Sequence, residues 1–187
     1  MKYLHKKGLI LTMLGILFLT TNAIAQLDLP RGSQIAKVSQ RIGITDAIII
    51  YSRPRVNNRE VWGELVPYGM NNLGFGTAKE SPWRAGANEN TVIKFTDDVK
   101  IEGHDLAAGK YGLHMIIHED NKATVIFSKN NNAWGSYFYD PSDTILQVDV
   151  DTEEVTHTEL LTFNFIAVDA TSATLALAWE KKRIPLK

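Results

Sequence analysis

The stretch L-Q-V-D-V at residues 146–150 alternates apolar and polar side chains without interruption. Successive side chains of a β-strand point to opposite faces of the sheet, so this period of two predicts a half-buried strand. We expect Leu146, Val148 and Val150 to face a core, and Gln147 and Asp149 to face outward. A strand with one covered face is typical of an antiparallel sheet.

The same alternation recurs along most of the chain. Its other apolar members are Ala36, Val38 and Ile42; Ile93 and Phe95; Tyr111, Leu113, Met115 and Ile117; Ala123, Val125 and Phe127; Phe163 and Phe165; and Leu175, Leu177 and Trp179. The run AIIIY (Ala47–Tyr51) is continuously apolar, which predicts a central strand covered on both faces. Turn-forming residues separate these runs, for example at Glu119–Lys122 and Asp169–Ser172. The sequence thus predicts an all-β fold, an antiparallel β-sandwich of about 8–10 short strands.

One connection is much longer than the others. Residues Asn57–Pro82 contain six Gly or Pro residues, a composition typical of a loop. Within it, Val61, Trp62 and Leu65 have near-helical spacing, so Asn58–Leu65 could form a helical turn or two. Long loops in compact domains are commonly functional or disordered, and aromatic residues favour packing over disorder. We therefore expect one long Gly/Pro-rich loop that packs against the domain.

The N-terminal residues have the pattern of a signal peptide. Three lysines precede the apolar run Gly8–Leu19, and Ala23-Ile24-Ala25 offers a cleavage site, so we predict a signal peptide over residues 1–25. The apolar run of 12 residues is shorter than the ~20 needed to cross a bilayer. We expect cleavage after Ala25, a periplasmic or secreted protein, and no membrane span after cleavage. An uncleaved N-terminal anchor is the alternative.

The composition describes one globular domain. Removing 25 of the 187 residues leaves 162, enough for a single domain over residues 26–187 with a substantial core. Its 17 basic and 21 acidic residues give a net charge of −4, which argues against nucleic acid as a partner. The absence of cysteine excludes disulfides, thiolate metal ligands, a lipid-modified cysteine and a cysteine nucleophile. We expect no cofactor.

The segment P-W-R-A-G-A-N-E-N (Pro82–Asn90) gathers functional side chains in a loop just before a strand. Trp83 and Arg84 supply a ring surface and a planar cation, and Asn88 and Glu89 supply an amide and a carboxylate. Such a set suits a sugar face or a ligand that carries a carboxylate.

Four further motifs accompany this segment: Y-S-R-P (Tyr51–Pro54), L-V-P-Y-G (Leu65–Gly69), A-G-K-Y (Ala108–Tyr111) and W-G (Trp134–Gly135). Together they resemble the secreted bacterial family catalogued as domain of unknown function 2911, over roughly Leu29 to Pro185. The resemblance implies kinship and assigns no activity. In many members L-V-P-Y-G leads almost directly into W-R, whereas Met70–Pro82 intervenes here, so this chain resembles a longer-loop form.

Glu89 has two possible roles. It could be the acid or base of a hydrolase that acts on an envelope glycan, but hydrolysis needs a second carboxylate across the bond. Glu64, Asp140 and Asp143 lie in or near loops, and no spacing pairs any of them with Glu89. We therefore expect Glu89 to anchor the loop by pairing with an arginine, either Arg84 or Arg53.

The histidines do not predict a metal site. His114 and His118 lie on the same face of one strand, ~13 Å apart, which is too far for one ion. We expect both at the surface or at a sheet edge. Ser136 lacks the sequence surroundings of an activated nucleophile.

These considerations leave three hypotheses of different classes. The leading one is a non-catalytic module that binds a small polar ligand, glycan or peptide. The alternatives are the glycan hydrolase and a purely structural envelope protein. The candidate ligand-binding residues are Tyr51, Arg53, Trp83, Arg84, Asn88, Glu89, Trp134 and Tyr139.

Overall fold

The structure is a computed structural model that describes residues 29–187. The chain divides into two units, Met1–Pro30 and Arg31–Lys187, and every strand among the described residues belongs to the second unit. The predicted signal peptide and its cleavage site lie outside the described residues.

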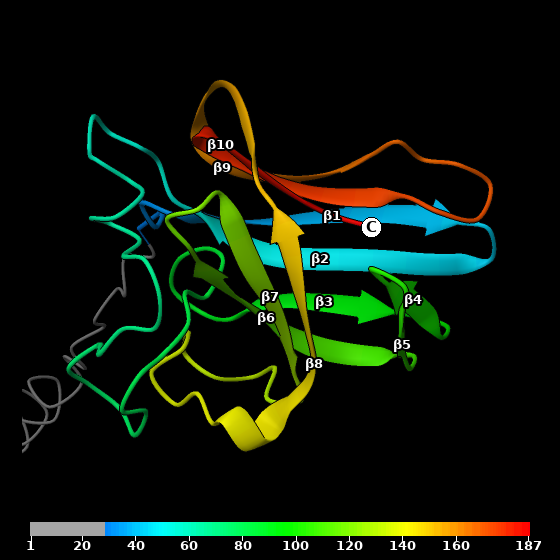
Figure 1. Cartoon of the computed structure of the whole chain (residues 1–187), viewed down its shortest axis with the longest axis horizontal. Helices are drawn as coiled ribbons and strands as arrows, with labels where there is room; N and C mark the ends of the chain where they lie inside the picture. Colours follow the sequence, from blue (N-terminus) through cyan, green and yellow to red (C-terminus); the bar gives the residue numbers. More distant parts are fainter. Residues whose placement is uncertain (1–28) are drawn as a thin grey trace, which may run out of the picture. The chain divides into compact units, whose positions relative to one another are not determined.

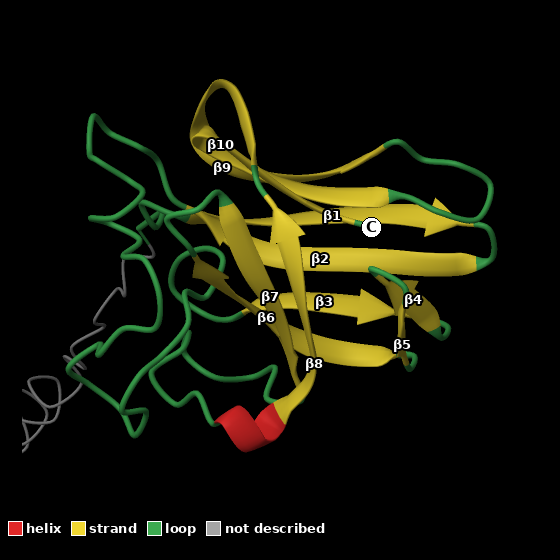
Figure 2. Ribbon diagram, viewed as in Figure 1, coloured by secondary structure: helices red, strands yellow, loops and turns green. Residues whose placement is uncertain are grey.

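The second unit is built from ten strands and one 3₁₀ turn. These are β1 (Gln34–Ile42), β2 (Thr45–Arg53), β3 (Thr91–Phe95), β4 (Val99–Ile101), β5 (His104–Leu106), β6 (Gly109–Ile117), β7 (Lys122–Ser128), η1 (Pro141–Asp143), β8 (Thr144–Asp151), β9 (Glu153–Ile166) and β10 (Thr174–Leu186). All strand pairs are antiparallel, so the all-β prediction is confirmed (Figure 2). Across residues 29–187 the structure contains no helix that could span a bilayer.

Six strands form one sheet in the order β1-β2-β3-β6-β7-β8 (Figure 1). The other four form two hairpins, β9–β10 and the small β4–β5. Strand β9 contacts β1 and β2, whereas β10 contacts β8 at the opposite end of the strand order. In Figure 1, β7 and β8 cross the direction of β1–β3 steeply. The sheet therefore curves, and the β9–β10 hairpin packs between its two ends.

The alternation in residues 146–150 has the predicted orientation. Val148 and Val150 are buried and Leu146 packs partly buried against the same core, while Gln147 and Asp149 are exposed. The sheet contributes further buried side chains from β6 and β7, and the hairpin adds its own. The largest of these are Leu113, Met115, Ile117, Phe127, Leu161, Phe163, Leu177 and Trp179.

Over the run Ala47–Tyr51, strand β2 is fully buried on one face only, so the prediction of cover on both faces is wrong there; cover on the other face begins at Ser52, which is buried. Ala47, Ile49 and Tyr51 are buried, whereas Ile48 is partly buried and Ile50 is 39% exposed. The β9–β10 hairpin covers one face of the sheet. On the opposite face, loop residues reach β6 and β7 and leave Ile50 of β2 open to solvent.

The long loop between β2 and β3 covers residues 54–90 and extends beyond the ends of the strands (Figure 2). Val61 and Val66 are buried in the core. The segment Asn58–Leu65 contains turns but no helix, so the helical prediction is wrong. Gly63 explains this, because its φ of 95° lies outside the helical region and its N–H donates to the Val66 carbonyl at 2.9 Å.

Candidate functional site

Trp83 extends the sheet beyond the N-terminal end of β3. Strand β3 begins at Thr91, which pairs with Leu113 of β6, so the edge of β6 beyond that point has no strand partner. Trp83 occupies this edge: its N–H donates to the Met115 carbonyl, and the Met115 N–H donates to the Trp83 carbonyl, both at 2.8 Å. These two hydrogen bonds fix the loop backbone beside β6 and so fix the starting point of the next side chain, Arg84.

Three indole rings form a cluster next to this bridge. Trp83 stacks on Trp179 with ring centroids 6.0 Å apart and planes at 15°. Trp62 meets both rings edge-on, at 5.8 Å from Trp83 and 5.9 Å from Trp179. Offset-stacked and edge-to-face contacts are the favoured aromatic arrangements, so the cluster forms a rigid wall.

Arg84 lies over an aromatic ring and has only neutral partners. Its guanidinium lies 4.7 Å from the centre of the Tyr137 ring, and Nη1 donates to the Asn88 carbonyl at 2.8 Å. A Cβ at Gly135 would approach Nη1 to 2.3 Å, so the side chain fits only because residue 135 is glycine. No carboxylate within residues 29–187 pairs with this half-buried cation.

Arg59 provides a second guanidinium whose hydrogen-bond partners are all neutral. Its Nε donates to the Val56 carbonyl at 3.0 Å and its Nη2 donates to the Arg55 carbonyl at 2.5 Å. In the described part of the chain it has no acidic partner either. Both cations are thus held in place by backbone carbonyls, which leaves their charge available to a ligand.

A cleft of about 320 Å³ opens beside these arginines. Trp83 and Trp179 contribute aromatic surface to it, and Asn88 contributes an amide. The full lining is Ser33, Pro54, Arg59, Leu65, Val66, Pro67, Asn71, Leu73, Ser81, Pro82, Trp83, Arg84, Gly86, Ala87, Asn88 and Trp179. As far as the structure describes the chain, this lining contains two arginines and no Asp or Glu.

Glu89 pairs with Arg31, so the prediction that it pairs with Arg84 or Arg53 is wrong. The Glu89 Oε1 accepts a hydrogen bond from Nη1 of Arg31, and the two side chains are 39% and 53% exposed. The hydrogen bond from Arg31 holds the pKa of the Glu89 carboxyl below its usual value. Oε2 is enclosed and has no hydrogen-bond partner among residues 29–187. Arg31 is distant in sequence, which is why local spacing did not reveal this pair.

His114 is buried, so its predicted place at the surface or an edge is wrong. It is 2% exposed, and its Nδ1 lies 2.8 Å from Oγ of Ser136, which is 1% exposed. Burial, with a smaller contribution from the charge of Arg84, lowers the pKa of His114 to about 4. The Tyr139 ring packs edge-on against the imidazole at 5.6 Å. The segment after β7 therefore covers this face of β6, and the histidine beneath it is neutral near pH 7.

The described residues contain no cluster of side chains suited to metal binding. Within residues 29–187, no three His, Asp or Glu side chains lie close enough to hold a metal ion. His118, just beyond β6, bonds Oγ1 of Thr124 through Nε2 at 2.9 Å, and that hydroxyl donates to Asp149 at 2.6 Å. This chain of hydrogen bonds joins β6, β7 and β8.

The comparisons with known proteins bear on kinship. The sequence model of a family described as "Protein of unknown function (DUF2911)" matches residues 33–187, which include all ten strands. The chain belongs to the DUF2911 family. No curated protein and no solved structure matches it significantly.

In this DUF2911 chain, three of the eight candidate residues line the cleft, namely Trp83, Arg84 and Asn88. Asn88 also donates from Nδ2 to the Ser33 carbonyl at 3.2 Å, which ties the loop to the start of β1. Two lining residues that the sequence did not single out are Arg59 and Asn71. Neither differs in its local pattern from the other polar residues of the long loop.

Two candidates instead join β2 to β9. Tyr51 is 3% exposed, and its hydroxyl accepts the N–H of Phe163 at 3.0 Å. Arg53 donates from Nε to the Leu161 carbonyl at 2.9 Å and from Nη2 to Oγ1 of Thr162 at 2.6 Å. Both side chains are engaged between the strands, outside the cleft.

The remaining candidates, Trp134, Tyr139 and Glu89, do not line the cleft. Trp134 of the DUF2911 chain is 48% exposed, and Arg31 lies 5.8 Å from the centre of its ring. Tyr139 contacts His114 and shares a hydrogen bond of 3.2 Å with Thr144. Glu89, paired with Arg31, directly follows the lining residue Asn88 in the sequence but does not line the cleft itself.

Proposed function

We propose that this chain is a non-catalytic, exported binding module whose cleft beside Trp83 and Arg84 takes a small polar ligand carrying a carboxylate, such as a peptide terminus or an acidic sugar. The observation that carries the proposal is the lining itself. It combines two guanidinium groups, Arg59 and Arg84, with no acidic side chain from residues 29–187.

The positive charge of the lining favours a negatively charged ligand. Both guanidinium groups donate to backbone carbonyls and keep further N–H groups for a ligand. A planar guanidinium matches a carboxylate in geometry as well as in charge, because two parallel N–H groups can meet two oxygens. A cationic ligand would meet repulsion from both arginines.

The remaining lining suits the uncharged part of such a ligand. Trp83, Leu65 and Pro67 offer apolar surface, while Asn71 and Asn88 can each donate and accept. The volume of about 320 Å³ lies at the lower end of the range of small-molecule sites. A few residues of a peptide or one to two sugar rings are the matching size.

The alternatives fit less well. A glycan hydrolase needs two carboxylates about 5–10 Å apart across the bond, and the cleft lining offers no carboxylate from the described residues. A purely structural role suits a closed and fully paired cluster, whereas this cleft is open and both of its arginines lack acidic partners in the described part of the chain.

The setting of the module belongs to the same proposal. The signal-peptide pattern of residues 1–25 supports a periplasmic or secreted location. We also infer that the six-stranded sheet and the β9–β10 hairpin are the two layers of a β-sandwich. The contacts of β9 with β1 and β2, and of β10 with β8, support that inference.

The test uses matched pairs of probes that differ only in the carboxylate. N-acetylphenylalanine and its amide, acetyl-trialanine and its amide, and glucuronate and glucose are titrated into ¹⁵N-labelled protein. We expect the acids to shift the backbone amides of Gly86, Ala87 and Asn88, and the neutral partners to shift them weakly or not at all. Equal shifts with both members of every pair, or no shift with any acid, would contradict the proposal.

A further inference from the structure

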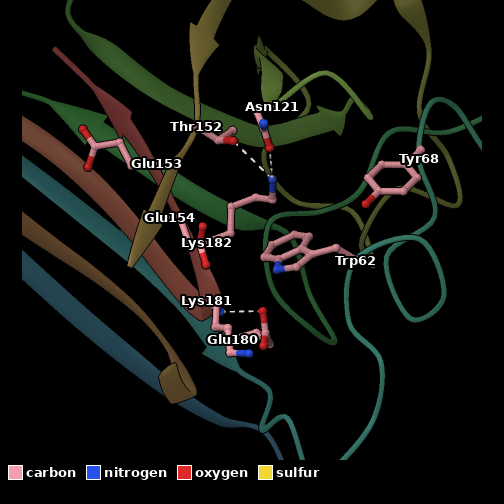
Figure 3. A pocket seen from close by; sticks show the side chains of 9 residues that line it. All are labelled: Trp62, Tyr68, Asn121, Thr152, Glu153, Glu154, Glu180, Lys181 and Lys182. Atoms are coloured by element: carbon pink, nitrogen blue, oxygen red, sulfur yellow. Dashed lines mark hydrogen bonds between the residues drawn. The ribbon is translucent and has the colours of Figure 1, made fainter. Parts of the chain in front are cut away.

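A second cavity lies on the other side of the indole cluster. It measures about 310 Å³ and is lined by Trp62, Tyr68, Asn121, Thr152, Glu153, Glu154, Glu180, Lys181 and Lys182 (Figure 3). None of these residues lines the cleft. Trp62 lines this cavity, while Trp83 and Trp179 line the cleft, so the three indole rings form part of the boundary between the two spaces.

Strands and loops from distant parts of the chain build this cavity. Trp62 and Tyr68 come from the long loop, and Asn121 comes from the β6–β7 turn. Figure 3 shows Lys182 reaching from β10 toward Asn121 and Thr152, with the Trp62 ring beside it. Nζ of Lys182 donates to Oγ1 of Thr152 at 3.2 Å and lies 5.9 Å from the centre of the Trp62 ring.

The lysine has donor capacity left for a ligand. Its ammonium carries three N–H groups, and its two hydrogen-bond acceptors, Thr152 and Asn121 at 3.5 Å, are both neutral. No carboxylate from residues 29–187 lies within ion-pair distance of its Nζ. Partial burial lowers the pKa of the Lys182 ammonium.

The strand that carries this lysine is irregular at the cavity. The β9–β10 register shifts on both sides of Glu180, between Ala178 and Glu180 and between Glu180 and Lys182. Glu180 has a φ of 54°, a conformation that non-glycine residues seldom adopt. Bulges redirect side chains and are common next to functional sites. Here they bring three consecutive polar side chains, Glu180–Lys182, to one cavity instead of alternating faces.

The charges around the cavity balance once Arg183, the partner of Glu153, is counted, and this balance favours a neutral ligand. Glu153 pairs with Arg183 at 3.1 Å, leaving Glu154 and Glu180 to set against Lys181 and Lys182. A ligand of either net charge would meet like charge in this cavity. A neutral ligand rich in hydroxyl groups could donate to the carboxylates and accept from the ammonium groups.

We propose that this cavity is a carbohydrate subsite that binds a neutral pyranose ring. The ring's hydroxyl groups bond Lys182, Glu154 and Asn121, and its C–H face packs against the aromatic surface of Trp62 and Tyr68. The subsite shares no lining residue with the carboxylate cleft, so sugar binding here can be tested independently of the function proposed above.

The experiment titrates ¹⁵N-labelled protein with methyl β-glucopyranoside, methyl α-mannopyranoside, methyl β-galactopyranoside and N-acetylglucosamine, to tens of millimolar. We expect at least one of them to shift the indole N–H of Trp62 and the amides of Asn121, Thr152 and Glu154. Lys182→Met should weaken that binding about tenfold, the effect of one hydrogen bond to a charged group. Glu154→Gln changes an exposed side chain and should weaken it with the fold intact, while Glu119→Gln, an exposed substitution outside the cavity, should not.

Three results would overturn the inference. One is the absence of shifts around the cavity with all four sugars. Another is binding that neither Lys182→Met nor Glu154→Gln weakens. The third is binding of glucosamine or glucuronate, the charged relatives, more tightly than any neutral sugar.

Discussion

The rings of Trp83 and Trp179 stack at 6.0 Å with their planes 15° apart, and both line the proposed carboxylate cleft. One comes from the long loop and the other from β10, so the stack connects the least regular part of the domain to a strand of its core. Because Trp83 is also hydrogen-bonded to Met115 at the backbone, the cleft wall is formed before any ligand arrives. Preorganisation of this kind reduces the entropy lost on binding.

Gly135→Ala should displace Arg84. The new Cβ would lie 2.3 Å from Nη1 of the guanidinium, so the arginine must leave its position over Tyr137. We expect a loss of about 1–3 kcal/mol of unfolding free energy together with loss of acid binding. The control is Gly74→Ala, which has a similar φ of 68° but nothing within 4 Å of its Cβ. Urea unfolding and the acid titration of both variants check this; a Gly135→Ala protein that binds as wild type would contradict it.

Tyr51→Phe should destabilise the domain by about 1–3 kcal/mol, because it leaves the buried N–H of Phe163 without its acceptor. The matched control is Tyr68→Phe, at a tyrosine that is 38% exposed and has no hydrogen bond within the described residues. Chemical unfolding of the two variants measures the difference. Equal stabilities would show that the Tyr51 hydroxyl contributes little to the junction of β2 and β9.

His114 should make stability depend on pH. Its pKa is lowered from 6.5 to about 4 in the folded protein, so the unfolded chain takes up a proton first as the pH falls. His114 therefore leaves the free energy of unfolding unchanged above pH 6.5 and lowers it progressively below that pH. The loss from this residue reaches about 3 kcal/mol once the pH is under 4. In His114→Leu this part of the slope should vanish. Unfolding free energies measured from pH 7 to pH 4 test it, and identical slopes in the two proteins would contradict it.

Arg31→Ala and Glu89→Gln should each change the unfolding free energy by less than about 1 kcal/mol, since solvent reaches the pair at both side chains, which are 53% and 39% exposed. The two changes should be coupled, with the double variant losing less than the sum. Because folding lowers the pKa of Glu89, the pair stabilises the fold fully at pH values above the pKa of Glu89 in the unfolded chain. This small stabilisation is lost as the pH falls through the pKa of Glu89 in the folded protein. A loss of several kcal/mol in either single variant would contradict the account.

The sequence predicted the parts of the fold that depend on local pattern. Alternation alone orients the side chains of β8, because burial of one face forces a period of two. The same logic failed at His114, because its strand face is covered by the segment that carries Ser136, and alternation cannot show what a loop will cover. It failed at Glu89 for a related reason: its partner Arg31 lies 58 residues away. The loop motif did locate Trp83, Arg84 and Asn88, whereas Arg59 reached the cleft through loop geometry that no local signal predicts.

The central claim is that Arg84 receives a carboxylate in the cleft. The most direct measurement follows the Nε–Hε signal of Arg84, assigned by comparison with Arg84→Met, while N-acetylphenylalanine and its amide are titrated in turn. We predict that the acid moves this signal and that Arg84→Met weakens acid binding by about 10–100-fold, as expected for loss of a charge-assisted contact, whereas Arg41→Met, at an exposed arginine outside the cleft, leaves it unchanged. An Arg84 signal whose chemical shift does not change when the acid is added, or equal affinity of the acid for wild type and Arg84→Met, would contradict the account.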